Sequence, residues 1–456
     1  MRIRAAPGGR LQGSIRVAGD KSIAHRWLIL ASTASSRSRL TGLPSVLDVG
    51  STASTLANLT VKARPALDLW ARNVSSRVEG GGSTWNDTLD GVSHGRLEVE
   101  GEGRDGLVEP RGRLDCGNAG TSMRLLAGLL AAAPFTTELT GDPSLSSRPM
   151  ERVASPLRSM GAAVRTTDGH APISVTGGRL VGIEHRTEVP SAQVKGAVLL
   201  AGVWASGETV VLESAPTRDH TERAFEALGA PVHRDGRRVG ISRFQHEGFG
   251  AAVPGDPSSA AFVVAAAALT GSEVTVEGVG LNPTRLHFLE VLSRMGVATE
   301  TSVAGEELGE PVGSIHVLSP DALRATTVDA DELPLVIDEV PVLAMLGTHA
   351  PAETRFLGAS ELRVKESDRL TALVEGIRAL GGQAAAEADD LVIAGGGLRG
   401  GVASSGGDHR LAMAFAVGAL AGDRPSDVAG MEAAAVSFPD FVGALRSLGA
   451  AIEVIG

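Results

Sequence analysis

The chain has 456 residues, of which 43% are hydrophobic and 21% charged. This composition is typical of a globular protein with a sizeable core and excludes wholesale disorder. Acidic residues outnumber basic ones by 53 to 42, so the formal net charge is -11, which argues against a general nucleic-acid-binding protein, in which a basic excess is expected. The basic residues are 38 arginines and only four lysines, at Lys21, Lys62, Lys195 and Lys365.

Cysteine content and the length of the apolar runs further restrict the class of protein. The single cysteine, Cys116, forms neither an internal disulfide nor a multi-cysteine metal site. The first residues lack the apolar core of a signal peptide. The longest apolar run, 260–269, has half the roughly 20 residues that span a bilayer. We therefore expect a cytoplasmic protein without a metal, a membrane or a nucleic acid as its partner.

A short phrase ending in glycine recurs along the chain, after an amphipathic stretch and before an alternating one. Its glycines are spaced by 68, 67, 85 and 68 residues, at Gly161, Gly229, Gly296, Gly381 and Gly449. A glycine just past a helix adopts the left-handed conformation that ends the helix, and a strand follows. The spacing predicts a repeated α/β unit, with a sixth, degenerate copy in which Thr60 replaces the glycine. Six units exceed one core, so we expect two domains of three units.

The stretch 71–113 fits this repeat worst. It contains Gly101–Gly106, which formally matches a dinucleotide-binding GxGxxG motif after the strand-like Leu97–Glu100. The proline at 110 argues against the helix that such a motif requires. We therefore predict a loop at Gly101–Gly106.

Several polar runs stand where an apolar helix is expected to begin. Lys21, Ser22 and Arg26 form one of them; the run lacks the glycine spacing of a P-loop, which argues against an NTPase. A helix N-terminus beside a lysine and a serine suits an anion, although a solvated helix start is the alternative. Similar runs are 115–124, 141–150, 191–195, 217–222 and 253–259.

Carboxylates also occur inside or beside apolar runs. Asp338 and Glu339 lie within the apolar run 335–342, where charge is uncommon unless it has a partner or a function. The segment 361–369 alternates cations and acids, which also fits an exposed, ion-paired helix start. His409 precedes another helix of small residues. It is a candidate general base, and the alternative is a structural partner in a turn.

Eight motifs occur in an order that resembles the enolpyruvyl transferases, and within them the members that act on shikimate 3-phosphate. They are Gly-Asp-Lys-Ser-x-x-His-Arg, Gly-Asn-Ala-Gly-Thr, Arg-Pro-Met, Ser-Ala-Gln-Val-Lys, Pro-Gly-Asp-x-Ser-Ser-Ala, Ile-Asp-Glu-x-Pro-Val-Leu, Arg-Val-Lys-Glu-Ser-Asp-Arg and Asp-His-Arg. The resemblance covers nearly the whole chain. It implies an α/β fold of two similar domains, each of three βαβαββ units, in an inside-out α/β barrel arrangement. The expected domains are 18–249 and 1–17 plus 250–456, with the active site in the cleft between them.

The resemblance also implies an activity and a set of site residues. The enolpyruvyl group of phosphoenolpyruvate moves to the 5-hydroxyl of shikimate 3-phosphate, and phosphate is released. The residues implied for shikimate 3-phosphate are Lys21, Ser22, Arg26, Ser191, Ala192, Gln193, Thr217, Arg218, Asp338 and Lys365. Those implied for phosphoenolpyruvate are Lys21, Gly120, Arg124, Arg148, Gln193, Arg369 and Arg410.

The implied chemistry needs a base for the 5-hydroxyl and an acid for the methylene carbon of phosphoenolpyruvate. We assign the base to Asp338 and the proton donor to Glu366, with Lys21 assisting. No cofactor is expected, and the protein is expected to act as a monomer. Gly120 leaves room where alanine would crowd the phosphoenolpyruvate site, so we expect inhibition by glyphosate, which occupies that site in the family.

Three other functions fit the sequence less well. The sister transferase that acts on UDP-N-acetylglucosamine uses a cysteine in a mobile loop, whereas in this chain Ser146 and Ser147 occupy that loop and Cys116 is better placed for packing. A non-catalytic ligand-sensing relative is disfavoured by intact Lys21, Asp338, Glu366 and Arg410. An RNA-end-processing relative is disfavoured by the acidic net charge.

Overall fold

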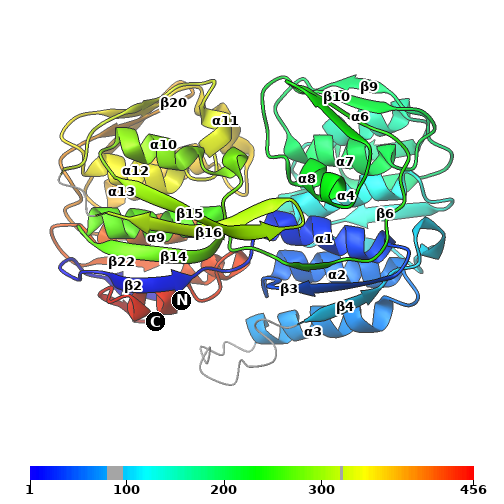
Figure 1. Ribbon diagram of the computed structural model, residues 1–456. Helices are drawn as coiled ribbons and strands as arrows, with labels where there is room; N and C mark the ends of the chain where they lie inside the picture. Colours follow the sequence, from blue (N-terminus) through cyan, green and yellow to red (C-terminus); the bar gives the residue numbers. More distant parts are fainter. Residues whose placement is uncertain (80–95, 319–321) are drawn as a thin grey trace. The chain divides into compact units, whose positions relative to one another are not determined.

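The chain forms two compact units in the computed structural model, which describes residues 1–79, 96–318 and 322–456 (Figure 1). Unit 1 comprises Met1–Ala18, Pro254–Gly305 and Pro311–Gly456. Unit 2 comprises Gly19–Val253 and Glu306–Glu310. Each unit has its own hydrophobic core.

The strands of unit 2 lie in three sheets. The strands of each sheet are named in their spatial order, so that each is hydrogen-bonded to the one named next. The first sheet contains β13 (Gly250–Ala252), β3 (Arg37–Thr41) and β4 (Leu97–Glu100). The second contains β5 (Leu114–Asp115), β6 (Thr136–Thr140), β8 (His170–Thr176) and β7 (Ala163–Thr167). The third contains β9 (Glu184–Arg186), β10 (Thr209–Leu212), β12 (Arg238–Ile241) and β11 (Val232–Asp235).

Unit 1 is also built on three sheets. They contain β2 (Gln12–Arg16), β14 (Glu273–Gly280), β16 (Glu310–Val317) and β15 (Thr299–Glu307); β17 (Thr327–Val328), β18 (Thr354–Phe356), β20 (Asp390–Ala394) and β19 (Gln383–Glu387); and β21 (Val402–Ser404), β22 (Ser426–Ala429), β1 (Arg2–Ala5) and β23 (Ile452–Val454).

The same pairing recurs in all six sheets. A parallel pair such as β5–β6, β9–β10 or β17–β18 is followed by an antiparallel partner of its second strand. Helices connect the parallel strands, since parallel pairing needs a long crossover. The sheet of β13, β3 and β4 keeps this pattern but has no further strand among the described residues, and helix α3 (Arg64–Glu79) lies in the intervening chain. The repeated α/β unit predicted from the glycine spacing is therefore confirmed.

The five recurring glycines end helices as predicted. Their φ angles are 109°, 87°, 86°, 80° and 105° in chain order, which is the left-handed region that glycine adopts without a Cβ clash. They follow α6 (Glu151–Ser159), α8 (His220–Ala227), α10 (His287–Arg294), α13 (Arg369–Ala379) and α15 (Phe441–Ser447).

The predicted sixth copy is only half right. Helix α2 (Leu47–Leu59) does end at this point, but Thr60 has an extended backbone with φ of -129°. The chain then continues into helix α3 rather than a strand, because a residue with a Cβ does not support the left-handed turn back into a strand.

The prediction of a loop at Gly101–Gly106 is confirmed, since β4 is followed by a short 3₁₀ turn at Arg104–Gly106 and no α-helix begins there.

Each repeat contributes one helix that is buried on nearly every side. These helices are α1 (Lys21–Thr33), α4 (Gly120–Leu130) and α7 (Ala192–Gly202) in unit 2, and α9 (Pro257–Leu269), α12 (Val340–Thr348) and α14 (His409–Ala419) in unit 1. A helix that is apolar all round belongs in a core. The second helix of a repeat, such as α10, buries only one face. Shorter elements are α5 (Pro143–Ser146), α11 (Leu333–Val336) and 3₁₀ turns at Pro283–Arg285, Ala359–Val364 and Met431–Val436.

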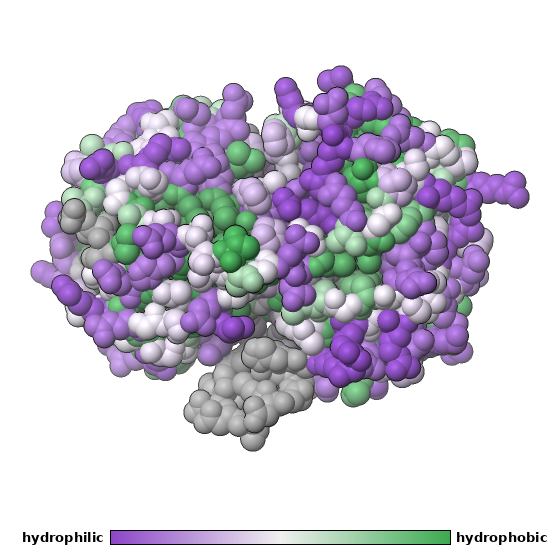
Figure 2. Space-filling model, viewed as in Figure 1, coloured by the Kyte–Doolittle hydropathy of each residue, from purple (hydrophilic) through white to green (hydrophobic). Residues whose placement is uncertain are grey.

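Hydrophilic side chains are spread over the visible face of both units (Figure 2). Within the described residues, no helix has both the length and the apolar character needed to cross a bilayer.

Helices α4 and α7 approach closely at Gly128. A Cβ at this position would lie 2.2 Å from the carbonyl oxygen of Ala197, which is far inside van der Waals contact. The absence of a side chain therefore sets the separation of two helices whose first turns carry Gly120 and Gln193.

We expect Gly128→Ala to push α4 and α7 apart and to destabilise unit 2 by about 1–3 kcal/mol, as overpacking does. Thermal unfolding should show a lower midpoint. Gly112→Ala is the matched control, because Gly112 is exposed and an added Cβ there would meet nothing within 4 Å. Equal unfolding midpoints for the two variants would contradict the close approach.

Candidate active site

The start of α1 in unit 2 carries two cations with different partners. Lys21 forms an ion pair with Asp48 of α2, with Nζ 2.7 Å from Oδ2. Arg26 is only 3% exposed; its Nε donates to Thr221 Oγ1 at 2.8 Å and its Nη1 to the carbonyl oxygen of Ser22 at 2.8 Å. Burial lowers the pKa of Arg26 to about 10, so the guanidinium is still charged at neutral pH.

Two guanidinium groups converge on the start of α4. A Cβ built on Gly120 would lie 3.2 Å from Nη1 of both Arg124 and Arg148. Arg124 donates to the side-chain oxygen of Gln193, whose Nε2 donates to Thr121 Oγ1 at 2.8 Å. No side chain in the described part of the chain caps this helix. Helix N–H groups beside two guanidinium groups suit a carboxylate or a phosphate.

The first turn of α7 and the loop before α8 complete the polar groups of unit 2. Ser191 caps α7 by accepting a hydrogen bond from the N–H of Val194 at 3.3 Å, and Ala192 and Gln193 begin the helix. Thr217 and Arg218 lie half-buried in the loop before α8. Thr217 donates its hydroxyl to the carboxylate of Glu213.

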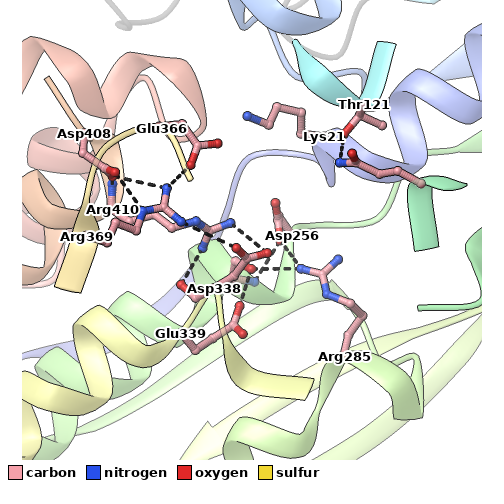
Figure 3. Close-up of polar contacts among 12 residues, drawn as sticks. Lys21, Thr121, Asp256, Arg285, Asp338, Glu339, Glu366, Arg369, Asp408 and Arg410 are labelled. Carbon is pink, nitrogen blue, oxygen red and sulfur yellow. Dashed lines mark hydrogen bonds and ion pairs between the residues drawn. The ribbon is translucent and has the colours of Figure 1, made fainter. Parts of the chain in front are cut away.

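In unit 1, Arg369 lies among three carboxylates (Figure 3). It is 1% exposed. Its Nε is 2.7 Å from Asp408 Oδ2, its Nη2 is 2.5 Å from Glu366 Oε2, and its Nη1 is 3.7 Å from Asp338 Oδ1. Burial alone would lower the pKa of Arg369, but the carboxylates of Glu366 and Asp408 outweigh burial and raise it above the ordinary value. The guanidinium is therefore permanently charged.

Arg410, in the first turn of α14, holds Asp338 from a second side. Its Nη1 donates to the carbonyl oxygen of Asp338 at 2.9 Å, and its Nη2 is 3.6 Å from Asp338 Oδ2. Lys365 is half-buried, and burial, with help from the charge of Arg369, lowers its pKa although Asp338 and Glu366 oppose this. The cluster thus combines cations and carboxylates in equal number, which lets the charges remain partly buried.

A second polar cluster includes the residue that follows Asp338 in the chain. Glu339, the next residue, accepts from Ser258 Oγ, and Arg285 Nη2 lies 2.9 Å from both Ser258 Oγ and Asp256 Oδ1 (Figure 3). All four side chains are buried. These contacts fix the turn between α11 and α12 that presents Asp338.

Two residues considered in the sequence have different surroundings. Cys116 is fully buried, and burial raises the pKa of its thiol to about 12, so it stays protonated and unreactive at neutral pH. His409 is a buried first residue of α14, next to the capping carboxylate of Asp408. Among the described residues, no group of three His, Cys, Asp or Glu side chains could hold a metal ion.

Comparison with known proteins identifies the family. The family model described as EPSP synthase (3-phosphoshikimate 1-carboxyvinyltransferase) matches residues 5–79 and 89–445. The chain belongs to the EPSP synthase family.

Individual relatives in this family match along their whole length. The chain is 44% identical over 454 residues to the 3-phosphoshikimate 1-carboxyvinyltransferase of Methylococcus capsulatus, covering 99% of this chain and 98% of that protein. It is also 44% identical to the enzyme of the same name from Halorhodospira halophila, with 99% and 97% covered. The solved EPSP synthase of Acinetobacter baumannii superimposes with a TM-score of 0.84 at 37% identity over the full length of both chains.

These findings confirm the resemblance and the fold class stated from the sequence. The enolpyruvyl transferase NikO of Streptomyces tendae has a TM-score of 0.73 at 19% identity, covering 99% of this chain and 98% of that one. Such a likeness shows the fold alone.

The residues expected at the site lie together within each unit. In unit 2 they lie near the starts of α1, α4 and α7 and in the loop before α8, and Arg148, between α5 and α6, reaches the start of α4; in unit 1 they surround Arg369. Two partners were not predicted from the sequence: Asp48, which pairs with Lys21, and Glu213, which accepts from Thr217. Asp48 carries the signal that identified Asp338, an acid amid apolar neighbours.

The pair Arg369–Asp408 should make the stability of unit 1 depend on pH. Burial raises the pKa of Asp408, but the charges of Arg369 and His409 outweigh this, so its pKa lies below the ordinary value. Its contribution to stability is therefore complete above the unfolded-state pKa of about 3.9 and is lost as pH falls through the lower, folded-state value.

We expect Asp408→Asn to lower the thermal midpoint of unfolding at pH 7, since breaking a buried ion pair costs about 3–5 kcal/mol. The gap to the parent protein should narrow progressively below about pH 4. Asp423→Asn removes an exposed carboxylate paired with Arg399 and should change the midpoint little at any pH. A gap for Asp408→Asn that does not vary with pH would contradict the assignment.

Proposed function

We propose that the protein is a 3-phosphoshikimate 1-carboxyvinyltransferase. It transfers the enolpyruvyl group of phosphoenolpyruvate to the 5-hydroxyl of shikimate 3-phosphate and releases phosphate, a step of the shikimate pathway towards aromatic amino acids. The observation that carries the proposal is full-length identity of 44% with relatives of that name, together with charged side chains suited to both substrates.

The charge of the substrates accounts for the composition of the site. The two substrates bring two phosphates and two carboxylates, which charge-assisted hydrogen bonds from arginine and lysine bind best. For shikimate 3-phosphate we propose Lys21, Ser22, Arg26, Ser191, Ala192, Gln193, Thr217, Arg218, Asp338 and Lys365; for phosphoenolpyruvate, Lys21, Gly120, Arg124, Arg148, Gln193, Arg369 and Arg410. On this proposal residues of both units act on one pair of substrates, in a cleft between two domains.

In the reaction, Asp338 accepts the proton of the 5-hydroxyl while that oxygen attacks C2 of phosphoenolpyruvate. Glu366 donates a proton to the methylene carbon, which becomes a methyl group in a tetrahedral adduct. Lys21 assists by stabilising negative charge. The adduct then loses phosphate and a methyl proton, which restores the double bond.

The contact between Glu366 and Arg369 bears on this assignment. An ion pair with arginine favours the carboxylate form, whereas a proton donor must be protonated. When the carboxylate of phosphoenolpyruvate binds Arg369, it competes with Glu366 for the same guanidinium. Substrate binding thereby frees Glu366 to hold a proton, and the arginine serves both binding and acid–base control.

The proposal also includes the setting in which the protein works. We propose a monomer that acts in the cytoplasm on small molecules and requires no cofactor. For the cytoplasm, the support is the single, buried, free Cys116, which is compatible with a reducing compartment.

The test is phosphate release from phosphoenolpyruvate with shikimate 3-phosphate as acceptor, compared with UDP-N-acetylglucosamine. We expect release only with shikimate 3-phosphate, because the thiol of Cys116 is buried and protonated. Release with the sugar nucleotide alone would replace the proposed function by that of the sister transferase.

Asp338→Ala should lower kcat by about 10²–10⁴-fold, the usual contribution of a general base. Asp331→Ala, which removes an exposed carboxylate shortly before α11, is the control and should be near normal. Near-normal turnover by Asp338→Ala with both substrates saturating would refute the assignment of the base.

Glyphosate should inhibit the parent protein, and Gly120→Ala should weaken that inhibition. The added Cβ would lie 3.2 Å from Nη1 of both Arg124 and Arg148, so the guanidinium groups must shift. Overpacking of this size raises the inhibition constant about tenfold or more, with a smaller rise of the KM for phosphoenolpyruvate. Unchanged turnover of the parent at high glyphosate would overturn this prediction.

A further inference from the structure

Lys195 is a buried lysine for which the proposed reaction has no use. It lies in the first turns of α7, and its side chain is 1% exposed. Its Nζ is 2.9 Å from Glu213 Oε1 and 2.7 Å from Glu222 Oε1. Two nearly inaccessible carboxylates around one ammonium form a buried charge cluster, which folds only when the partners are well placed.

The cluster connects three groups proposed to bind shikimate 3-phosphate. Glu213 follows β10, and the same Oε1 that accepts from Lys195 also accepts from the hydroxyl of Thr217. Lys195 itself lies two residues after Gln193 on the same helix.

Glu222 extends the cluster to α1. It lies in the first turn of α8, next to Thr221, whose Oγ1 accepts from Arg26 Nε at 2.8 Å. The charge of Glu222 also raises the pKa of Arg26 against the effect of burial. One buried cluster therefore reaches α7, the Thr217 loop and Arg26.

The surroundings favour lysine over arginine at this position. An ammonium is a compact charge with three donors, whereas a guanidinium is a wide, planar fork. The helix packs closely against its neighbours at the next residue, since a Cβ on Gly196 would lie 2.8 Å from Thr221 Oγ1 and 3.0 Å from a methyl carbon of Leu125. Lysine is thus kept at this position in a chain that otherwise prefers arginine, with 38 arginines and four lysines.

We propose that Lys195 is a positioning residue for recognition of the 3-phosphate. Through Glu213 it fixes the hydroxyl of Thr217, and through Glu222 it fixes α8 and the partner of Arg26. Lys195 contacts no substrate and transfers no proton. This inference rests on the proposed function and adds to it the origin of the preference for a phosphorylated acceptor.

The test measures selectivity rather than activity alone. For each variant, kcat/KM is determined with shikimate 3-phosphate and with shikimate, which lacks the phosphate, at saturating phosphoenolpyruvate. In Lys195→Met we expect the ratio of the two values to fall about tenfold, the usual effect of losing a hydrogen bond at a charged group. Lys195→Arg should not restore the ratio, although it keeps the charge.

Three further variants separate positioning from stability. Val175→Ala removes buried apolar volume from β8 of the same unit and should lower the unfolding midpoint without changing the ratio. Thr217→Val should reproduce part of the lower ratio, and its combination with Lys195→Met should give the same ratio as Lys195→Met alone, since the contact of Thr217 with Glu213 is one of the two routes through which Lys195 acts. Glu213→Gln, which keeps the side-chain volume, should also lower the ratio. It replaces Lys195→Met as the test of the inference if that variant does not fold.

The outcomes distinguish this inference from the proposed function. If the parent protein shows no turnover with shikimate 3-phosphate, the proposed function fails. If the parent is active but folded Lys195→Met or Glu213→Gln keeps the parental ratio, Lys195 is only a stabilising residue and the inference is overturned.

Discussion

Anionic ligands require cations, and cations near the starts of buried helices require polar or acidic partners of their own. This constraint organises both units. Lys21 is held by Asp48, and Arg369 by Asp408 and Glu366. Each cation is thereby fixed in place before a ligand arrives, and pre-organised charge binds and stabilises better than charge that must first be ordered. The net charge of -11 is compatible with the anionic substrates proposed, because on that proposal binding depends on these local groups.

The repeated fold places most of these charged groups near the starts of the buried helices. Every repeat supplies one buried helix, and in most of these helices polar residues gather in the first two turns, as Lys21 and Arg26 do in α1. Hydrogen bonds join neighbouring helix starts. In unit 1, Arg410 of α14 donates to the carbonyl oxygen of Asp338 in the turn before α12; in unit 2, Gln193 of α7 donates to Thr121 of α4. The glycine at the end of the second helix lets the chain return to the sheet. A modest repeated unit thus yields several helix starts that carry polar and charged residues.

The sequence predicted the features that depend on local physics. The periodic glycines predicted where five helices end, and polar runs predicted where helices such as α1, α7 and α9 begin. Thr60 was misinterpreted as a degenerate copy of the repeat, although a residue with a Cβ does not favour the left-handed turn that leads back into a strand. The partner carboxylates were missed for another reason: Asp48 and Glu213 meet Lys21 and Lys195 only through tertiary packing, and a single sequence does not show such pairs.

The most direct test of the central claim is identification of the products by NMR after incubation with phosphoenolpyruvate and shikimate 3-phosphate. The account predicts that phosphate appears in equal amount with an enol ether at the 5-oxygen of the acceptor, and that the acceptor keeps its 3-phosphate. Phosphate released without consumption of the acceptor, or an enolpyruvyl group on another hydroxyl, would contradict it.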